Sequence, residues 1–409
     1  MSDSITPSTP APATQGKRDI VFLIITAFLM MQPLSTDLYL ASLPGLALTF
    51  AVPAATVQLT LSMFVVGFGL AQLIVGPLSD KYGRRPVVLA GVAVYVLASL
   101  ACAAAPGIYG LIAARFAQAL GCCTAVVIAR AIVRDVYPPE QSVKVIAKAS
   151  SWLALAPLTG PIIGSYLQVW YGWRAAFIVL SAFACLVWVL VWFKLSETNR
   201  QPDPKATAVS GLLRNFKIVL GHRNFWAYAI PGALSYGSIF AFISGSSLVL
   251  IKVLNLPTSW FGYCFAFGVS GYLTGTIVCR HLHKSIGDER AFLLGTTVSL
   301  SAGLLFLSMV LAGIAHWSMI PPVMFLTMGA HGINFPITQS NAVAPFPQQA
   351  GTAAGLLGAF YSAFAFLVGS VVGLSYNGTL YPLAIIAACL GSAIFISTRL
   401  LRRQALRPA

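Results

Sequence analysis

Long apolar runs alternate with short polar segments along almost the whole chain. The hydrocarbon core of a bilayer is about 30 Å thick, and a helix needs roughly 20 apolar residues to cross it. Runs of this kind predict helices over residues 20–41, 57–78, 86–105, 108–130, 146–168, 174–194, 225–249, 260–280, 291–312, 318–340, 350–373 and 379–398. The pattern therefore predicts an all-α membrane protein with twelve transmembrane helices.

The composition supports a membrane protein, and the distribution of charge predicts its orientation in the membrane. Of the 409 residues, 58% are hydrophobic and 9% are charged, whereas about 25% of the residues of a soluble domain are charged. The net charge is +15, but Lys and Arg gather in alternate loops, and the opposite loops hold only Arg174 and Lys252. This bias predicts that both termini are cytoplasmic. The basic residues set the topology, so we expect the lipid bilayer and no nucleic acid as a partner.

The polar segments divide the sequence into five parts. Residues 1–17 form a Ser-, Thr-, Pro- and Ala-rich tail that is predicted to be disordered and lacks a signal-peptide pattern, and residues 401–409 form a basic tail. Residues 18–195 and 224–400 are each predicted to form a six-helix bundle. Residues 196–223 are a predicted cytoplasmic linker with an amphipathic helix on the inner leaflet. The apolar face of that helix would consist of Leu212, Leu213, Phe216, Val219 and Leu220.

Weak internal repetition supports two pseudo-symmetric halves. A basic loop follows the second span of each half, at 80–85 and 280–290, and a Gly-rich fifth span recurs at 160–164 and 351–358. Two related halves with a site between them near the membrane midplane are typical of secondary transporters.

Asp37 is the acidic residue that falls inside a predicted span, while the other nine of the ten lie in tails, loops or span ends. A charge in hydrocarbon is costly, and by default it marks a functional site. A buried carboxylate can change its protonation state as its surroundings change, so Asp37 is our candidate for proton coupling. The alternative is a carboxyl group that packs between helices and never titrates.

Arg115 is the second charge that we place inside a span. Asp37 lies late in an outward-running helix and Arg115 early in an inward-running one, so both should lie in the outer half of the membrane. An ion pair would remove two unpaired charges. The alternative, that each side chain bonds to neutral groups, stays open.

Other polar and aromatic side chains in the spans are candidates for a substrate cavity. A polar stripe in the tenth span contains His331, Asn334 and Asn341, and His331 is either a second titrating group or a packing residue. The candidate binding residues are Asp37, Tyr39, Arg115, Gln118, Trp152, Tyr236, Phe240, His331, Asn334, Asn341 and Tyr361. The seven cysteines match no zinc or disulfide framework, so we expect no metal site.

The loop Gly76-Pro-Leu-Ser-Asp-Lys-Tyr-Gly-Arg-Arg-Pro86 resembles the motif between spans 2 and 3 of the major facilitator superfamily. The resemblance implies that Asp80 meets the N-terminus of span 11 and that Arg84 pairs with Asp135. It further implies a latch that closes the cytoplasmic side. The latch residues would be Gly76, Asp80, Gly83, Arg84, Arg85 and Asp135.

Two more segments, Arg115–Gly121 in span 4 and Ala156–Gly164 in span 5, resemble motifs of drug:proton antiporters. Pro33–Pro44 in span 1, together with Thr60–Ser62 and Gly351–Ala353, resembles the bicyclomycin-resistance (Bcr/CflA) subfamily of these antiporters. The antiporter motif of span 5 contains Pro157, Gly160, Pro161 and Gly164. The resemblance implies proton-driven efflux of small antibiotics, such as bicyclomycin, phenicols or sulfonamides, across a bacterial inner membrane. It also implies a monomer that needs no cofactor besides the proton gradient.

The motifs also exclude several classes of protein. The sequence contains no P-loop, no His-Glu-x-x-His and no Gly-x-Ser-x-Gly, so we expect neither an ATP-driven pump nor an enzyme. An importer, and an exporter of a small metabolite such as an amino acid, stay open as alternatives. The mechanism that we expect is alternating access, with Asp37 exchanging a proton and Arg115 holding it ionised.

Overall fold

The structure is a computed structural model that describes residues 15–153, 155–199 and 201–405. Within these ranges every regular element is helical. The long helices are α1 (Gln15–Asp37), α3 (Ala54–Tyr82), α4 (Arg84–Ala104), α5 (Ile108–Val136), α8 (Arg174–Lys194), α10 (Arg223–Ser247), α11 (Thr258–Leu311), α12 (Ile320–Val343), α13 (Ala350–Ser375) and α14 (Tyr381–Ala405). The shorter helices are α2 (Leu43–Thr49), α6 (Pro139–Leu153), α7 (Leu155–Tyr171) and α9 (Val209–Leu220).

Twelve predicted spans correspond to these helices. Nine helical segments in the described ranges are long and apolar enough to cross a membrane. One of them, α11, contains two predicted spans, because the backbone leaves the helical conformation at Gly287, where φ is 79°. The pair α6 and α7 accounts for the fifth span, and α12 for the tenth. The prediction of an all-α membrane protein with twelve spans is confirmed.

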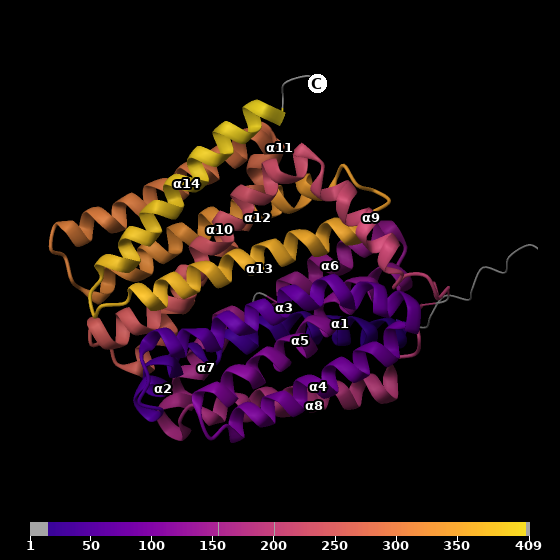
Figure 1. The fold of residues 1–409 in the computed structure, drawn as a ribbon, viewed down its shortest axis with the longest axis horizontal. Coiled ribbons are helices and arrows are strands. Elements are labelled where there is room, and N and C mark those ends of the chain that lie inside the picture. The colour runs from indigo at the N-terminus through magenta and orange to yellow at the C-terminus, as the bar shows by residue number, and fades with distance from the viewer. Residues whose placement is uncertain (1–14, 154, 200, 406–409) are drawn as a thin grey trace, which may run out of the picture.

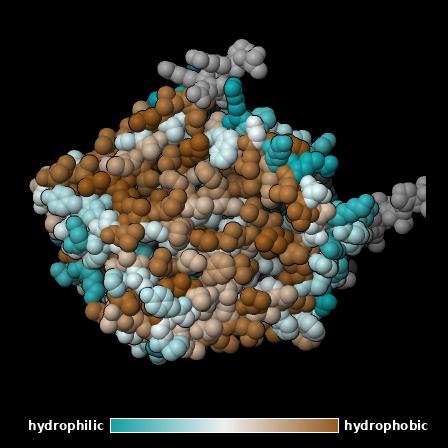
Figure 2. Space-filling view, viewed as in Figure 1, coloured by the Kyte–Doolittle hydropathy of each residue, from teal (hydrophilic) through white to brown (hydrophobic). Residues whose placement is uncertain are grey.

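The helices form two halves that lie side by side (Figure 1). We call α1–α8 the N-terminal half and α10–α14 the C-terminal half. Within the N-terminal half, α5 packs against α3 and α4; within the C-terminal half, α11 packs against α12 and α14. Two helix pairs, α3 with α13 and α7 with α11, join the halves. Figure 2 shows apolar residues over the middle of the molecule and hydrophilic ones toward its ends, as a bilayer requires.

The first span is interrupted, which the sequence pattern did not predict. Helix α1 ends at Asp37, and a 3-10 turn (Leu40–Ser42) and α2 follow, whereas we predicted one helix over 20–41. The turn comes just before Pro44, which occupies the first turn of α2. Proline lacks an N–H and is favoured at a helix start, so a new helix begins here. Asp37 is therefore the last residue of a helix and lies beside non-helical backbone.

The segments outside the two halves differ from the predictions at their edges. Helix α1 begins at Gln15 and α14 ends at Ala405, so helices extend into both predicted tails. The rest of those tails, 1–14 and 406–409, lies outside the described residues. Helix α9 lies in the predicted linker and packs against α13. Its Val219 is fully buried against the protein, so part of the predicted membrane face packs on the C-terminal half instead.

Candidate functional site

Arg115 is buried in the N-terminal half and is held by neutral groups. Its Nη1 donates to the Ser35 carbonyl at 3.0 Å and to Oε1 of Gln118 at 2.6 Å. Its Nε donates to the carbonyl of Thr60 at 3.4 Å. The Ser35 carbonyl lies two residues before Asp37, so α1 and α5 do bring these two residues to a similar depth.

Aromatic rings surround the same guanidinium. Its central carbon lies 4.3 Å from the ring centre of Phe64, 5.1 Å from that of Tyr39 and 5.7 Å from that of Phe177. A cation over a ring face is attracted by the ring quadrupole, more strongly when water is absent. Arg115 is thus accommodated without an acidic partner among the described residues.

Asp37 does not pair with Arg115 in this conformation. Its carboxylate accepts a hydrogen bond from the Thr36 hydroxyl at 2.9 Å, and the residue is 5% exposed. The alternative in which both charged residues bond to neutral groups therefore describes this structure. A buried charge with one neutral donor is poorly compensated, so gain or loss of a proton at Asp37 changes the energy of this conformation.

Glycines of the span 5 motif let α7 pack directly against Asp37 and its neighbour. A Cβ at Gly160 would lie 3.3 Å from the Cβ of Asp37. A Cβ at Gly164 would overlap the Leu38 backbone carbonyl. Only glycine at residue 164 allows this approach, whereas a side chain at residue 160 would be tightly packed. Proline at 161 packs on the other side of α7, where its carbonyl meets Gly262 of the C-terminal half.

The predicted polar stripe of the C-terminal half is hydrogen-bonded, with His331 and Asn334 buried and Asn341 half-buried. His331 Nδ1 lies 2.9 Å from the Ser235 hydroxyl, and its ring lies against Phe335 with 5.1 Å between ring centres. Asn334 donates to the Ser299 hydroxyl at 3.4 Å. Asn341 donates to the Ile337 carbonyl at 2.9 Å, within its own helix. These bonds satisfy most of the stripe without a ligand.

A cavity of about 650 Å³ lies between the two halves. It extends from Gln32 and Tyr236 to the end of the molecule that carries Asp80 and Arg84. A second cavity of about 670 Å³ shares part of its wall. The residues common to both are Arg130, Phe335, Gln339 and Ala354. These volumes suit a small ligand.

The predicted binding residues differ in their relation to this cavity. Tyr236 and Tyr361 line it. Trp152 is 53% exposed on α6 and does not line it. The half-buried Asn341 does not line it either. The others are buried and do not line it, namely Asp37, Tyr39, Arg115, Gln118, Phe240, His331 and Asn334. For all of these residues a role in binding stays a prediction.

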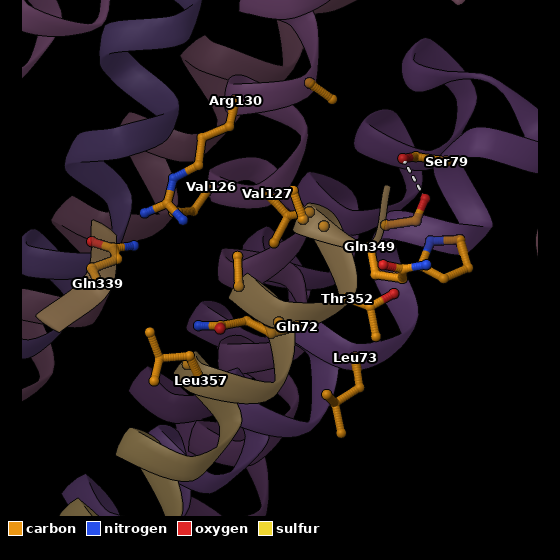
Figure 3. A pocket seen from close by; sticks show the side chains of 18 of the residues that line it. Gln72, Leu73, Ser79, Val126, Val127, Arg130, Gln339, Gln349, Thr352 and Leu357 are labelled. Carbon is orange, nitrogen blue, oxygen red and sulfur yellow. Dashed lines mark hydrogen bonds between the residues drawn. The ribbon is translucent and has the colours of Figure 1, made fainter. Parts of the chain in front are cut away.

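Several lining residues were missing from the prediction. Figure 3 shows Gln72, Arg130 and Gln339 reaching into the cavity from three helices, α3, α5 and α12. Polar side chains inside predicted spans were the available signal for the two glutamines. Arg130 is the last residue of the predicted span 108–130, whereas α5 continues to Val136, so Arg130 lies inside the helix rather than at its end.

Arg84 is at the centre of an ion-pair cluster at the start of α4. Its Nη1 lies 2.5 Å from Oδ1 of Asp80, and its Nε lies 3.0 Å from Oδ2 of Asp135. The Ser79 hydroxyl accepts a third bond at 2.7 Å. The Arg84–Asp135 pair that the family resemblance implies is present. We call the end of the molecule with this cluster the latch end.

Glu197 joins this cluster and was not predicted. Its carboxylate accepts from the backbone N–H groups of Arg84 at 2.8 Å and Arg85 at 3.0 Å. A negative charge is favoured at a helix N-terminus. Gly83 precedes this helix with φ at 94°, and a Cβ there would lie 2.6 Å from Glu197. The glycine is needed both for the backbone conformation and for the close carboxylate.

The two halves are apart at the latch end and in contact at the opposite end. The half-exposed Asp80 carboxylate has no hydrogen bond to α13 among the described residues, and the cavity lies between Asp80 and Gln349. At the opposite end Gln58 of α3 donates to the Ser244 carbonyl of α10. The implied contact between Asp80 and span 11 is therefore not made in this conformation, and the cavity opens at the latch end.

Comparison with known proteins identifies the family of this chain. Residues 23–370 match the family model of the Major Facilitator Superfamily. The chain is 29% identical over 388 residues to a bicyclomycin resistance protein homolog of Haemophilus influenzae, covering 94% of this chain and 96% of that one. It is 27% identical over 341 residues to multidrug resistance protein D of Escherichia coli, covering 83% and 84%.

The fold is similar to that of solved transporter structures. A bacterial homolog of the human lysosomal transporter Spinster, in an inward-facing and unoccupied conformation, superposes with a TM-score of 0.72. The match covers 97% of this chain and all of that one at 15% identity. At this identity the likeness supports the fold alone.

Proposed function

The chain belongs to the major facilitator superfamily, and from that premise we propose that it is a proton-coupled antiporter that exports small antibiotics. It is a multi-pass membrane transporter. The relatives that support drug efflux carry the names bicyclomycin resistance protein homolog and multidrug resistance protein D. Both come from bacteria, which supports a bacterial inner membrane as the location. The proposed energy source is the proton gradient, with no further cofactor, and the proposed unit is a monomer.

Asp37 is the observation that carries the proton-coupling part of the proposal. It is buried, it has one neutral hydrogen-bond donor, and it ends a helix beside non-helical backbone. Gly160 packs against it, and we propose that movement of α7 displaces the carboxyl group. We propose that Asp37 takes a proton from the outside and releases it toward the cytoplasm as the halves rock.

Arg115 has a positioning role in this mechanism. It bonds the Ser35 carbonyl in the last turn of α1 rather than the Asp37 carboxylate. We propose that it fixes the end of α1 in this conformation, and that a direct pair with Asp37 forms only when the halves move. A ligand and a proton can be coupled only as far as they favour different conformations.

The latch end supplies the second moving part. Here the Arg84 cluster is complete within the N-terminal half, and Asp80 lies across the cavity from the start of α13. Closure would bring the Asp80 carboxylate to that helix N-terminus, where a negative charge is stabilised.

Drug resistance in living cells tests the proposal. The chain is expressed in a bacterium without its own major efflux pumps, and growth is measured with bicyclomycin, chloramphenicol and a sulfonamide. We expect higher resistance to at least one drug, lost when an ionophore dissipates the proton gradient. Unchanged resistance to every drug, with the protein present in the membrane, would contradict drug export.

A further inference from the structure

Arg130 of α5 has no hydrogen-bond or ion-pair partner among the described residues, unlike the buried Arg115 of the same helix. Its guanidinium makes no hydrogen bond or ion pair with any residue in the described part of the chain, although Arg115 on the same helix makes three. Arg130 is exposed to the cavity that lies between the halves. A cation within a membrane-spanning helix is costly, and by default it marks a functional site.

The surroundings of Arg130 are polar but not acidic. It lines both cavities where they join, together with Phe335 and Gln339 of the C-terminal half. Figure 3 shows the Arg130 guanidinium and the Gln339 amide pointing toward one another, with the Gln72 amide extending toward the same space. Both amides can donate hydrogen bonds to an anion.

The charge of the described cavity wall is positive. Its basic members are Arg84, Arg130 and Arg134, and its acidic member, Asp80, is already paired with Arg84. Asp37 does not line the cavity. A low-dielectric cleft lined by one sign of charge concentrates ligands of the opposite sign.

An aromatic surface lies next to this positive site. The rings of Tyr236 and Tyr361 are stacked with 6.1 Å between their centres, and Phe335 lies 6.1 Å from Tyr361. All three rings line the first cavity. A planar apolar body that packs on these rings would place an acidic substituent within reach of Arg130.

We propose that the cavity binds aromatic or other planar molecules that carry a carboxylate or a similarly delocalised anion, with Arg130 as the anion-binding residue. Arg130 and Gln339 come from different halves, so an anion held by both draws the two halves together. A guanidinium binds a carboxylate through two parallel hydrogen bonds, which fixes the orientation of the ligand. That such an anion is a transported substrate rests on the proposed function. Its binding to this site can be tested without transport.

A matched pair of probes tests the site. The full-length protein is placed in nanodiscs of zwitterionic phosphatidylcholine, and binding of 2-naphthoate and of 2-naphthamide is measured by calorimetry. We expect naphthoate to bind about tenfold more tightly or better, because it alone supplies a charge to Arg130. Equal affinities of the two probes would overturn the proposal.

Variants test whether Arg130 causes that preference. Arg130→Gln should remove the preference for naphthoate and leave naphthamide binding within about twofold. Arg130→Lys should keep part of the preference, because it keeps the positive charge but loses the planar guanidinium that forms two parallel hydrogen bonds. The control is Arg214→Gln, which removes one positive charge from α9 outside the cavity wall. Naphthamide binding shows that each variant is folded. If Arg130→Gln leaves the preference intact, or if Arg214→Gln abolishes it equally, the assignment is wrong.

The same variants separate this inference from the proposed function. If the probes bind as expected but no drug raises resistance or moves protons, the anion site stands and drug export fails. If drugs move protons while naphthoate and naphthamide bind equally, drug export stands and the anion site fails.

Discussion

The two halves bury different kinds of polar groups. Among its described residues, the N-terminal half buries three charged side chains, Asp37, Arg84 and Arg115. Among the described residues of the C-terminal half, the buried polar side chains are Ser, Thr, Asn and His331, with no buried Asp, Glu, Lys or Arg. The two halves, although their helices are arranged in related ways, therefore differ in whether their buried polar side chains are charged or neutral.

This difference suggests a division of labour. A buried acid that gains or loses a proton changes the energy of a conformation, whereas a neutral side chain that keeps its protonation state does not. Proton-dependent steps should therefore depend on the N-terminal half. The C-terminal half should act as the neutral body against which the N-terminal half moves, and it should contribute mainly to the ligand cavity.

The largest effect should come from Asp37→Asn, which removes the proton site but keeps the shape of the side chain. We expect gradient-driven efflux to fall about 100-fold, the upper range of a coupling free energy between two sites. Exchange of labelled drug across vesicles without a gradient should continue. Loss of exchange and efflux together would mean that the variant has damaged the fold or the ligand site rather than coupling.

A smaller effect is expected from Arg115→Lys, which keeps the positive charge and loses the planar guanidinium. Lysine cannot reproduce the bonds to the Ser35 carbonyl and Gln118, so the unfolding free energy should fall by about 2 kcal/mol. Thermal unfolding in detergent measures this loss. The matched control is Arg134→Lys at the same helix's exposed end, which should change the unfolding temperature little.

At the latch end, Asp80→Asn should slow turnover about fivefold, because a neutral side chain gains less from the dipole of the α13 N-terminus. Drug affinity should change little, since the contact forms only on closure. Initial rates of transport and equilibrium binding are compared in the same vesicles. A weakened affinity with unchanged turnover would argue that Asp80 contacts the ligand instead of closing the cavity.

The smallest effect is expected from His331→Gln in the C-terminal half. Glutamine can replace the bond to the Ser235 hydroxyl, so transport and its dependence on the proton gradient should change by less than about twofold. If this variant uncouples transport as strongly as Asp37→Asn, the proton path extends into the C-terminal half and the division of labour is wrong.

Sequence reasoning predicted the spans because a bilayer demands long apolar runs. It missed the interruption after Asp37, since the apolar pattern continues through the turn. It ended the fourth span at Arg130, six residues too early, because hydropathy does not mark the end of a helix whose last turns are amphipathic. Such boundaries depend on packing against neighbouring helices rather than on local sequence.

The side-chain partners were harder to predict than the helices. The depth of Arg115 followed from its position in the sequence, but its bond to a backbone carbonyl rather than to Asp37 depends on rotamers and on rings from three other elements. Glu197 is 113 residues from Arg84, and nothing in its local sequence indicates that it caps α4. In contrast, the Arg84–Asp135 pair followed from the family motif.

Proton release from everted membrane vesicles tests the central claim most directly. Chloramphenicol, bicyclomycin or a sulfonamide is added to energised vesicles that contain the protein or its Asp37→Asn variant, and a pH-sensitive dye reports the lumen. The account predicts that at least one drug releases protons from the wild-type vesicles and none from the variant. Equal release from both would contradict the assignment of proton coupling to Asp37.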